Sequence, residues 1–130
     1  MRRRKDDHTL TKAEMEIMNI LWDENRPLST HSIIDKYPEP KPAYSTIATF
    51  MKILTTKKYV SYNKGVESDK TFYFYPLMSR FEYTRKYMKD VRNTLFGGSL
   101  NAFISFFAEE EGLSDKDLQD ILSIINKGQE

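Results

Sequence analysis

Hydroxyl and basic side chains recur between residues 44 and 56, and their spacing suits hydrogen bonding to DNA. Ser45, Thr49 and Lys52 fall on one face of the helix predicted there, and no carboxylate shares that face. A helix that enters the major groove needs a slim face that hydrogen-bonds and does not repel phosphates. Thr46 lies at the predicted helix start, where its hydroxyl and N–H could reach a phosphate. The predicted DNA-contacting residues are Lys41, Tyr44, Ser45, Thr46, Thr49, Lys52 and Lys64.

Bases would be read on this face mainly by hydroxyl groups. It holds no Arg, Gln or Asn, the side chains that make bidentate contacts to guanine and adenine. The sequence therefore predicts modest specificity for each half-site, which dimerisation would have to supplement. An ordinary surface helix with a polar face is the alternative reading of the same residues.

The distribution of charge also favours a polyanion as partner. The 130 residues hold 20 Lys and Arg against 19 Asp and Glu, a net charge of +1. Residues 1–76 carry 13 basic and 10 acidic side chains, whereas residues 97–130 carry 2 and 7. The stretch 40–66 has no acid and holds Lys41, Lys52, Lys57, Lys58 and Lys64. DNA would be attracted by this stretch and repelled by the tail, although a solvated basic surface accounts for the lysines equally well.

Residues that could support catalysis or hold a metal are few, so we expect no enzyme, no metal and no cofactor. His8 and His31 are the two histidines, they fall in different predicted elements, and there is no cysteine. No phosphate-binding glycine loop or nucleophile elbow is present. No apolar run reaches the roughly 20 residues of a membrane span, and residues 1–7 are charged. We expect a cytoplasmic protein without membrane insertion.

The N-terminal elements follow the order helix, helix, helix, hairpin. Thr11 and Glu14 have the spacing of a capping box before a helical apolar pattern, and Ser29 is the expected cap of a second helix. A third helix is predicted from about residue 43 to about residue 57, with the apolar stripe Ile47, Phe50, Met51 and Leu54. The period then changes to two, which predicts strands over 60–64 and 71–75 joined by a turn. This order is that of a winged helix-turn-helix.

Three further helices are predicted after Pro76, which divides the chain into a winged-helix domain, residues 1–76, and a helical domain, residues 77–130. Ser79, Ser99 and Ser114 are their expected caps. Their apolar side chains exceed what three short helices can bury among themselves, so we predict a homodimer, with an intramolecular cap as the alternative. The predicted dimerisation residues are Phe81, Met88, Val91, Leu95, Phe103, Phe107, Leu118, Ile121, Leu122 and Ile125. The predicted fold class is mainly α with a small β-hairpin: a winged helix-turn-helix followed by a three-helix dimerisation region.

Several motifs resemble the penicillinase repressor family, which includes the methicillin-resistance and copper-responsive repressors. They are the segments 10–22 (LTKAEMEIMNILW), 44–49 (YSTIAT) and 97–99 (GGS), together with Leu113-Ser114. The resemblance implies a homodimeric repressor whose winged helices bind a palindromic operator and whose C-terminal helices dimerise. By position, Ser45, Thr46 and Thr49 would face the bases and Lys52 the backbone.

Departures from the family pattern bear on the inducing signal and on the recognition helix. Ile53 stands where the family usually has an arginine, and Lys58 where a glycine usually ends the helix. Copper-responsive members have C-terminal cysteine pairs that this chain lacks. Members that respond to beta-lactams are cleaved at an Asn-Phe bond, whereas residues 105–107 read Ser-Phe-Phe. Cleavage by a sensor-linked protease, switching by a small molecule, and use of the winged helix as a protein-interaction module are the alternatives that stay open.

Overall fold

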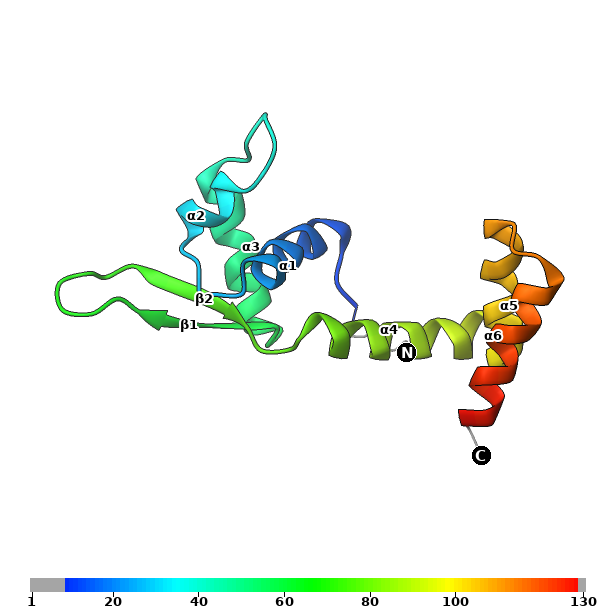
Figure 1. Cartoon of the computed structure of the whole chain (residues 1–130). Coiled ribbons are helices and arrows are strands. Elements are labelled where there is room, and N and C mark those ends of the chain that lie inside the picture. The colour runs from blue at the N-terminus through cyan, green and yellow to red at the C-terminus, as the bar shows by residue number, and fades with distance from the viewer. Residues whose placement is uncertain (1–8, 129–130) are drawn as a thin grey trace, which may run out of the picture. The chain divides into compact units, whose positions relative to one another are not determined.

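The computed structural model describes residues 9–128, which form six α-helices and one two-stranded antiparallel sheet (Figure 1). In chain order the elements are α1 (Lys12–Glu24), α2 (Thr30–Asp35), α3 (Tyr44–Thr56), β1 (Val60–Lys64), β2 (Phe72–Pro76), α4 (Arg80–Leu95), α5 (Leu100–Glu111) and α6 (Asp115–Gly128). The predicted class, a winged helix-turn-helix followed by three helices, is confirmed.

The chain divides into two compact units between Arg85 and Lys86, within α4. The N-terminal unit holds α1, α2, α3, the hairpin and the first turn of α4. The predicted domain boundary at residue 76 stays a prediction.

Side-chain caps fix the starts of the first two helices where the sequence predicted them. Thr11 and Glu14 form the complete capping box: the Glu14 N–H donates to Thr11 Oγ1 at 3.2 Å, and Glu14 Oε1 accepts the Thr11 N–H at 2.9 Å. Ser29 caps α2 by accepting the N–H of Ser32 at 3.2 Å. α1 ends at Asn25, whose φ of 55° lies in the left-handed region.

The N-terminal unit packs around one apolar core. The predicted stripe of α3 supplies Ile47, Met51 and Leu54, each at most 2% exposed, while Phe50 is half-buried at its edge. Fully buried residues from the other elements complete this core: Ile17, Met18, Leu21, Leu28, Ile33 and Val60. Because these side chains fix which face of α3 turns inward, its polar face must turn outward.

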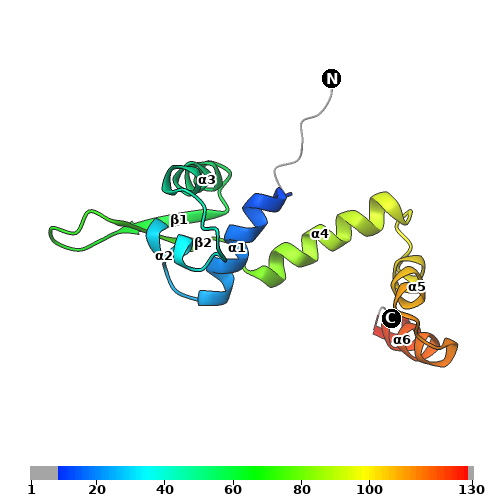
Figure 2. The same cartoon turned by 90° about the horizontal axis from the view of Figure 1, so that it is seen from above.

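The hairpin pairs β1 with β2 in the register Val60↔Pro76 to Lys64↔Phe72. Leu28 adds an isolated bridge to Phe74, with hydrogen bonds of 2.9 and 2.8 Å, and so ties the α1–α2 connection to the sheet. The far end of the hairpin extends away from the helices in both views (Figures 1 and 2). This extension is the wing of the fold.

α4 begins at the predicted cap Ser79, which forms a capping box with Glu82 through two hydrogen bonds of 3.0 Å. Its one buried side chain is Tyr83, at 4% exposure, which packs into the N-terminal core. Tyr83 is not among the residues that the sequence pattern indicated. Phe81 and Leu95, two of the predicted dimerisation residues on the same helix, are 70% and 74% exposed.

The C-terminal unit contains the rest of α4, α5 and α6. Ser99 caps α5 by accepting the N–H of Ala102 at 3.0 Å, and the Ser114 hydroxyl accepts the N–H of Asp117 at the start of α6. Among the described residues of this unit, Ala108 alone is buried. Within residues 9–128, no helix combines the length and the apolar character that a membrane crossing needs.

Candidate nucleic-acid interface

The outer face of α3 carries four of the predicted DNA-contacting side chains. Ser45, Thr46, Thr49 and Lys52 are all exposed, whereas Ile47 and Met51 on the opposite face are buried. Ala48, between them, is half-buried and adds little bulk. The face is therefore open, narrow and free of carboxylates, which is the surface that a major-groove helix needs.

The N-terminal end of α3 has no side-chain cap. Its N-cap residue is Ala43, and no side chain accepts a hydrogen bond from the first turn. Tyr44, the first residue of the helix, is 51% exposed, and its ring lies 4.8 Å from that of His31 on α2. A phosphate could therefore meet the partial positive charge of the helix end beside the Tyr44 hydroxyl.

Lys41 is engaged within the fold. Its Nζ donates to the carbonyl oxygen of Tyr37 at 2.6 Å and to that of Asp35 at 3.1 Å, at the C-terminal end of α2. Glu39 lies 3.9 Å from the same atom. Contact with a phosphate would have to compete with these partners, so Lys41 is a weaker candidate than the sequence suggested.

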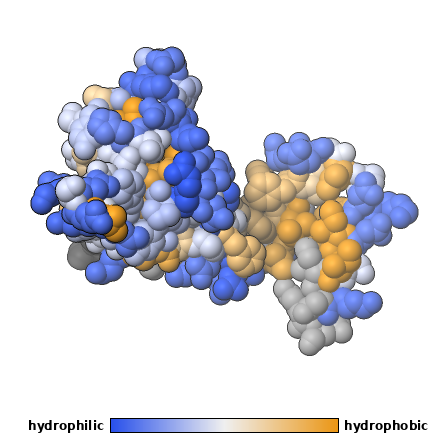
Figure 3. All heavy atoms as spheres, turned by 60° about the vertical axis from the view of Figure 1, so that its left-hand side comes forward, coloured by the Kyte–Doolittle hydropathy of each residue, from blue (hydrophilic) through white to orange (hydrophobic). Residues whose placement is uncertain are grey.

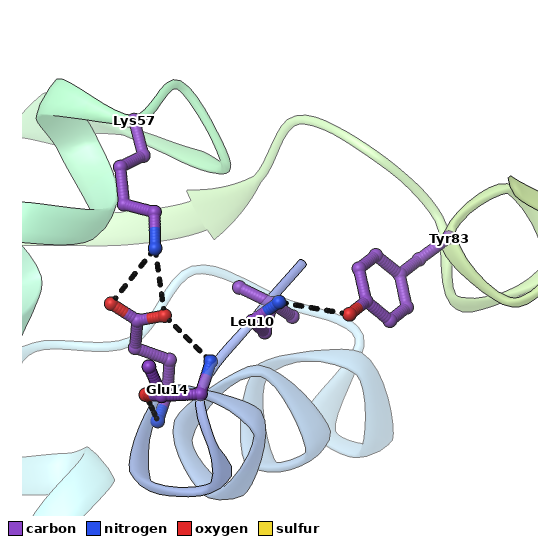
Figure 4. A network of polar contacts seen from close by, with 5 residues as sticks. Leu10, Glu14, Lys57 and Tyr83 are labelled. Atoms are coloured by element: carbon purple, nitrogen blue, oxygen red, sulfur yellow. Dashed lines mark hydrogen bonds and ion pairs between the residues drawn. The ribbon is translucent and has the colours of Figure 1, made fainter. Parts of the chain in front are cut away.

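Lys57 is also engaged, by a carboxylate on α1 (Figure 4). Its Nζ lies 2.9 and 3.2 Å from the two carboxylate oxygens of Glu14, whose side chain is 5% exposed. Burial raises the pKa of Glu14, but hydrogen bonds from the Thr11 N–H and from Lys57 outweigh burial, so the pKa lies below its ordinary value of 4.5. The positive charge of Lys57 is thus balanced within the protein.

The wing carries a lysine, Lys64, at the end of β1 next to the turn, and carboxylates in the turn itself. Lys64 is the last residue of β1 and is exposed, and its Nζ lies 5.8 Å from the centre of the Phe72 ring. In the turn, Asp69 accepts hydrogen bonds from the Thr71 N–H at 3.0 Å and the Tyr73 hydroxyl at 2.9 Å, which hold its pKa below the ordinary value. Glu67 lies in the same turn, so two carboxylates follow Lys64 closely and would weaken its attraction for a phosphate.

A groove of about 700 Å³ separates α3 from the wing. Its lining includes Tyr44, Lys52, Thr56 and Lys70, and no carboxylate residue lines it. Lys70 and His31 also belong to this lining, although neither is among the predicted DNA-contacting residues. The hairpin register could have indicated Lys70, since it lies two residues before Phe72, the last paired position of the wing.

The predicted dimerisation residues are incompletely buried wherever the structure describes their side chains. Phe107 is 45% exposed, and Phe81 and Leu95 are more exposed still. The others are partly buried: Met88, Val91, Phe103, Leu118, Ile121 and Leu122. The side chain of Ile125 lies outside the described residues. Apolar side chains gather over the C-terminal helices (Figure 3). This unit therefore leaves a large apolar surface without an internal partner.

Metal ligands do not converge anywhere in the described part of the chain. Within residues 9–128, no three His, Asp or Glu side chains are grouped so that they could hold a metal ion. His31 contacts the Tyr44 ring on the face described above, and His8 lies outside the described residues.

Comparison with known proteins gives consistent matches along the chain. A family model described as Penicillinase repressor matches residues 10–127. The chain is 28% identical over 121 residues to the methicillin resistance regulatory protein MecI of Staphylococcus aureus strain N315, covering 92% of this chain and 95% of that protein. It is 22% identical over 117 residues to the penicillinase repressor of Staphylococcus aureus, covering 90% of each. The penicillinase repressor of Bacillus licheniformis matches at 21% over 119 residues, covering 91% of this chain and 90% of that protein.

Proposed function

The chain belongs to the penicillinase repressor family, and we propose that it is a sequence-specific transcriptional repressor that binds a palindromic DNA operator as a homodimer in the cytoplasm. The resemblance seen in the sequence motifs is thereby confirmed at the level of the family. The winged helix would bind each half-site, and the C-terminal helices would join two chains.

One observation carries the DNA-binding part of the proposal: the exposed face of α3 holds Ser45, Thr46, Thr49 and Lys52 and no carboxylate. The core residues beneath it fix its orientation, so the face is permanently available. The adjoining groove, with Lys52 and Lys70 in its lining, supports passage of a sugar–phosphate strand between α3 and the wing.

The DNA upstream of the protein's own gene is the first operator to test. Fluorescence anisotropy should show tighter binding to this DNA than to a scrambled duplex, and a steep loss of affinity as salt rises. A protein-interaction module would instead bind a protein partner independently of salt and would not be retained on DNA or heparin. Equal binding to both duplexes would exclude a sequence-specific repressor.

The low burial of side chains in the C-terminal unit supports the homodimer. Residues 86–128 bury Ala108 alone among their described side chains, which makes a poor core for a single chain. A second copy would cover the same apolar faces symmetrically, as a two-fold interface requires. Sedimentation equilibrium should give twice the chain mass of 15.3 kDa, and a single chain at high concentration would refute the dimer.

Relief of repression by proteolysis is the third part of the proposal. Phe106 and Phe107 on α5 are 47% and 45% exposed, and they lie in the stretch 105–107 that the family resemblance matches to the cleaved bond. A cut there would remove the end of α5 and all of α6 from the dimerisation surface. Incubation with the protease domain of a neighbouring membrane sensor, followed by intact-mass measurement, should give fragments that end near residue 106. An uncut chain would exclude this mode of induction.

A further inference from the structure

Within the DNA-binding function proposed above, we infer that Glu14 is a positioning residue for α3, and that it acts by holding the C-terminal end of that helix through Lys57. The two residues are 43 positions apart in the sequence. Their contact joins the first turn of α1 to the C-cap of the helix that carries the DNA-contacting face.

The anchor on the α1 side is itself fixed. Glu14 is 4% exposed, and Oε1 accepts both the Thr11 N–H at 2.9 Å and the Lys57 ammonium at 2.9 Å (Figure 4). Rotating the carboxylate away from Lys57 would therefore also open the capping box. Because one carboxylate makes both contacts, its position is fixed, and it can in turn fix the position of Lys57 at the end of α3.

Apolar packing alone does not fix the position of α3 along its helix axis relative to the rest of the N-terminal unit. Ile47, Met51 and Leu54 choose the buried face, but the hydrophobic effect that holds them is non-directional. A charged hydrogen bond has defined length and direction, so the contact with Glu14 can set the axial position of the helix. Axial position matters because it decides which bases Ser45 and Thr49 would meet.

The chain turns sharply where Lys57 is held. The Lys57 N–H still donates to the Ile53 carbonyl at 2.9 Å, but Lys58 has a φ of 67°, and the Tyr59 N–H donates to the Leu54 carbonyl at 2.9 Å. The opposite end of α3, at Ala43, lacks a side-chain cap. The helix is thus anchored by a side chain at its C-terminal end and left accessible at the end that would face DNA.

The segment that enters the α1 cap is held in turn by α4. The Leu10 N–H donates to the hydroxyl of Tyr83 at 2.9 Å, and this bond is buried. The start of α1 therefore lies between a contact to α4 and a contact to α3 (Figure 4). Both contacts lie in the N-terminal unit and act on the same short segment.

The competing view is that Lys57 contacts a phosphate directly. The two views predict opposite effects of Glu14→Gln. Release of Lys57 from its carboxylate would free a positive charge and strengthen DNA binding if Lys57 were a phosphate contact. Loss of the anchor would weaken binding if Glu14 positions the helix.

The test compares Glu14→Gln, Lys57→Met and the double variant, with Lys58→Met as the control that removes the same charge one residue away. We expect each single variant to bind the operator about tenfold more weakly, the double variant no more weakly than the worse single variant, and Lys58→Met to stay closest to wild type. The salt dependence of Lys57→Met should equal that of wild type. Tighter binding by Glu14→Gln, or a salt slope reduced by about 0.9 per lost contact in Lys57→Met, would overturn the inference.

Hydrogen exchange without DNA separates this inference from the proposed function. In Glu14→Gln, the amides of Lys57 and Tyr59 should exchange about tenfold faster, while those of α2 stay unchanged. The double variant, Glu14→Gln with Lys57→Met, is the control for misfolding of a single variant, since it leaves no buried charge unpaired. Unchanged hydrogen exchange at the end of α3 in Glu14→Gln would refute the positioning role. Failure of the wild-type protein to bind DNA would refute the proposed function.

Discussion

Replacing Lys52 with alanine should make operator binding less sensitive to salt. Lys52 is exposed on α3, and within the described part of the chain its ammonium forms no ion pair. Each phosphate neutralised by a lysine contributes about 0.9 to the slope of log affinity against log salt, and a homodimer would lose two such contacts. The slope should therefore fall by about 1.8, so that between roughly 50 and 200 mM salt the variant loses about 12-fold less affinity than wild type.

Anisotropy titrations of both proteins against the upstream DNA, at four or more salt concentrations, measure this slope. The matched control is Lys116→Ala, which removes a lysine paired with Asp120 at 3.2 Å on α6. Its slope should equal that of wild type. A wild-type slope for Lys52→Ala, or an equal reduction for Lys116→Ala, would show that Lys52 does not neutralise a phosphate.

Four further outcomes follow from particular contacts. Thr49→Ala should reduce the ratio of operator to scrambled-DNA affinity more than it reduces affinity for scrambled DNA, because its hydroxyl would contact base edges; anisotropy against both duplexes measures this. Leu95→Glu should shift the sedimentation equilibrium to the single chain, since a side chain 74% exposed in one chain would place a charge in an apolar dimer interface. Tyr83→Phe leaves the Leu10 N–H without its acceptor, which should cost about 1–3 kcal/mol and lower the thermal midpoint by at least about 4 °C. Because the pKa of Glu14 is lowered by folding, its contribution to stability is present above the ordinary value of 4.5 and is lost as pH falls through the folded value; urea titrations below pH 4.5 should therefore show a smaller loss for Glu14→Gln than for wild type.

The sequence predicted those elements whose boundaries depend on local contacts. The capping boxes at Thr11 and Ser79 need only the residue three positions later, and both are present in the structure. The second strand begins at Phe72 and not at Thr71, because both backbone groups of Thr71 are used in the turn. Its N–H donates to Asp69, and its carbonyl accepts the N–H of Gly65 at 2.8 Å. Such a turn is not visible in a pattern of alternating side chains.

The electrostatics of the site could not be predicted from composition. An acid-free stretch of five lysines suggested five free positive charges, but Lys41 is held by carbonyl groups of α2 and Lys57 by Glu14. The partner of Lys57 lies 43 residues away, so it is known only once α1 and α3 are packed together. Tyr83 could not be found for the same reason, because its partner Leu10 lies 73 residues away in the sequence.

Weak half-sites and an apolar tail together explain why dimerisation would control repression. Without Arg, Gln or Asn on α3, and with two of five lysines engaged inside the fold, a single winged helix should bind DNA weakly at physiological salt. Joining two of them makes the second binding event intramolecular, which can raise affinity by about 10²–10⁴ without any new contact. The gain disappears when the C-terminal helices separate. A signal that separates the dimer would therefore cause the protein to dissociate from its operator, while the proposed DNA-contacting face of α3 stays unchanged.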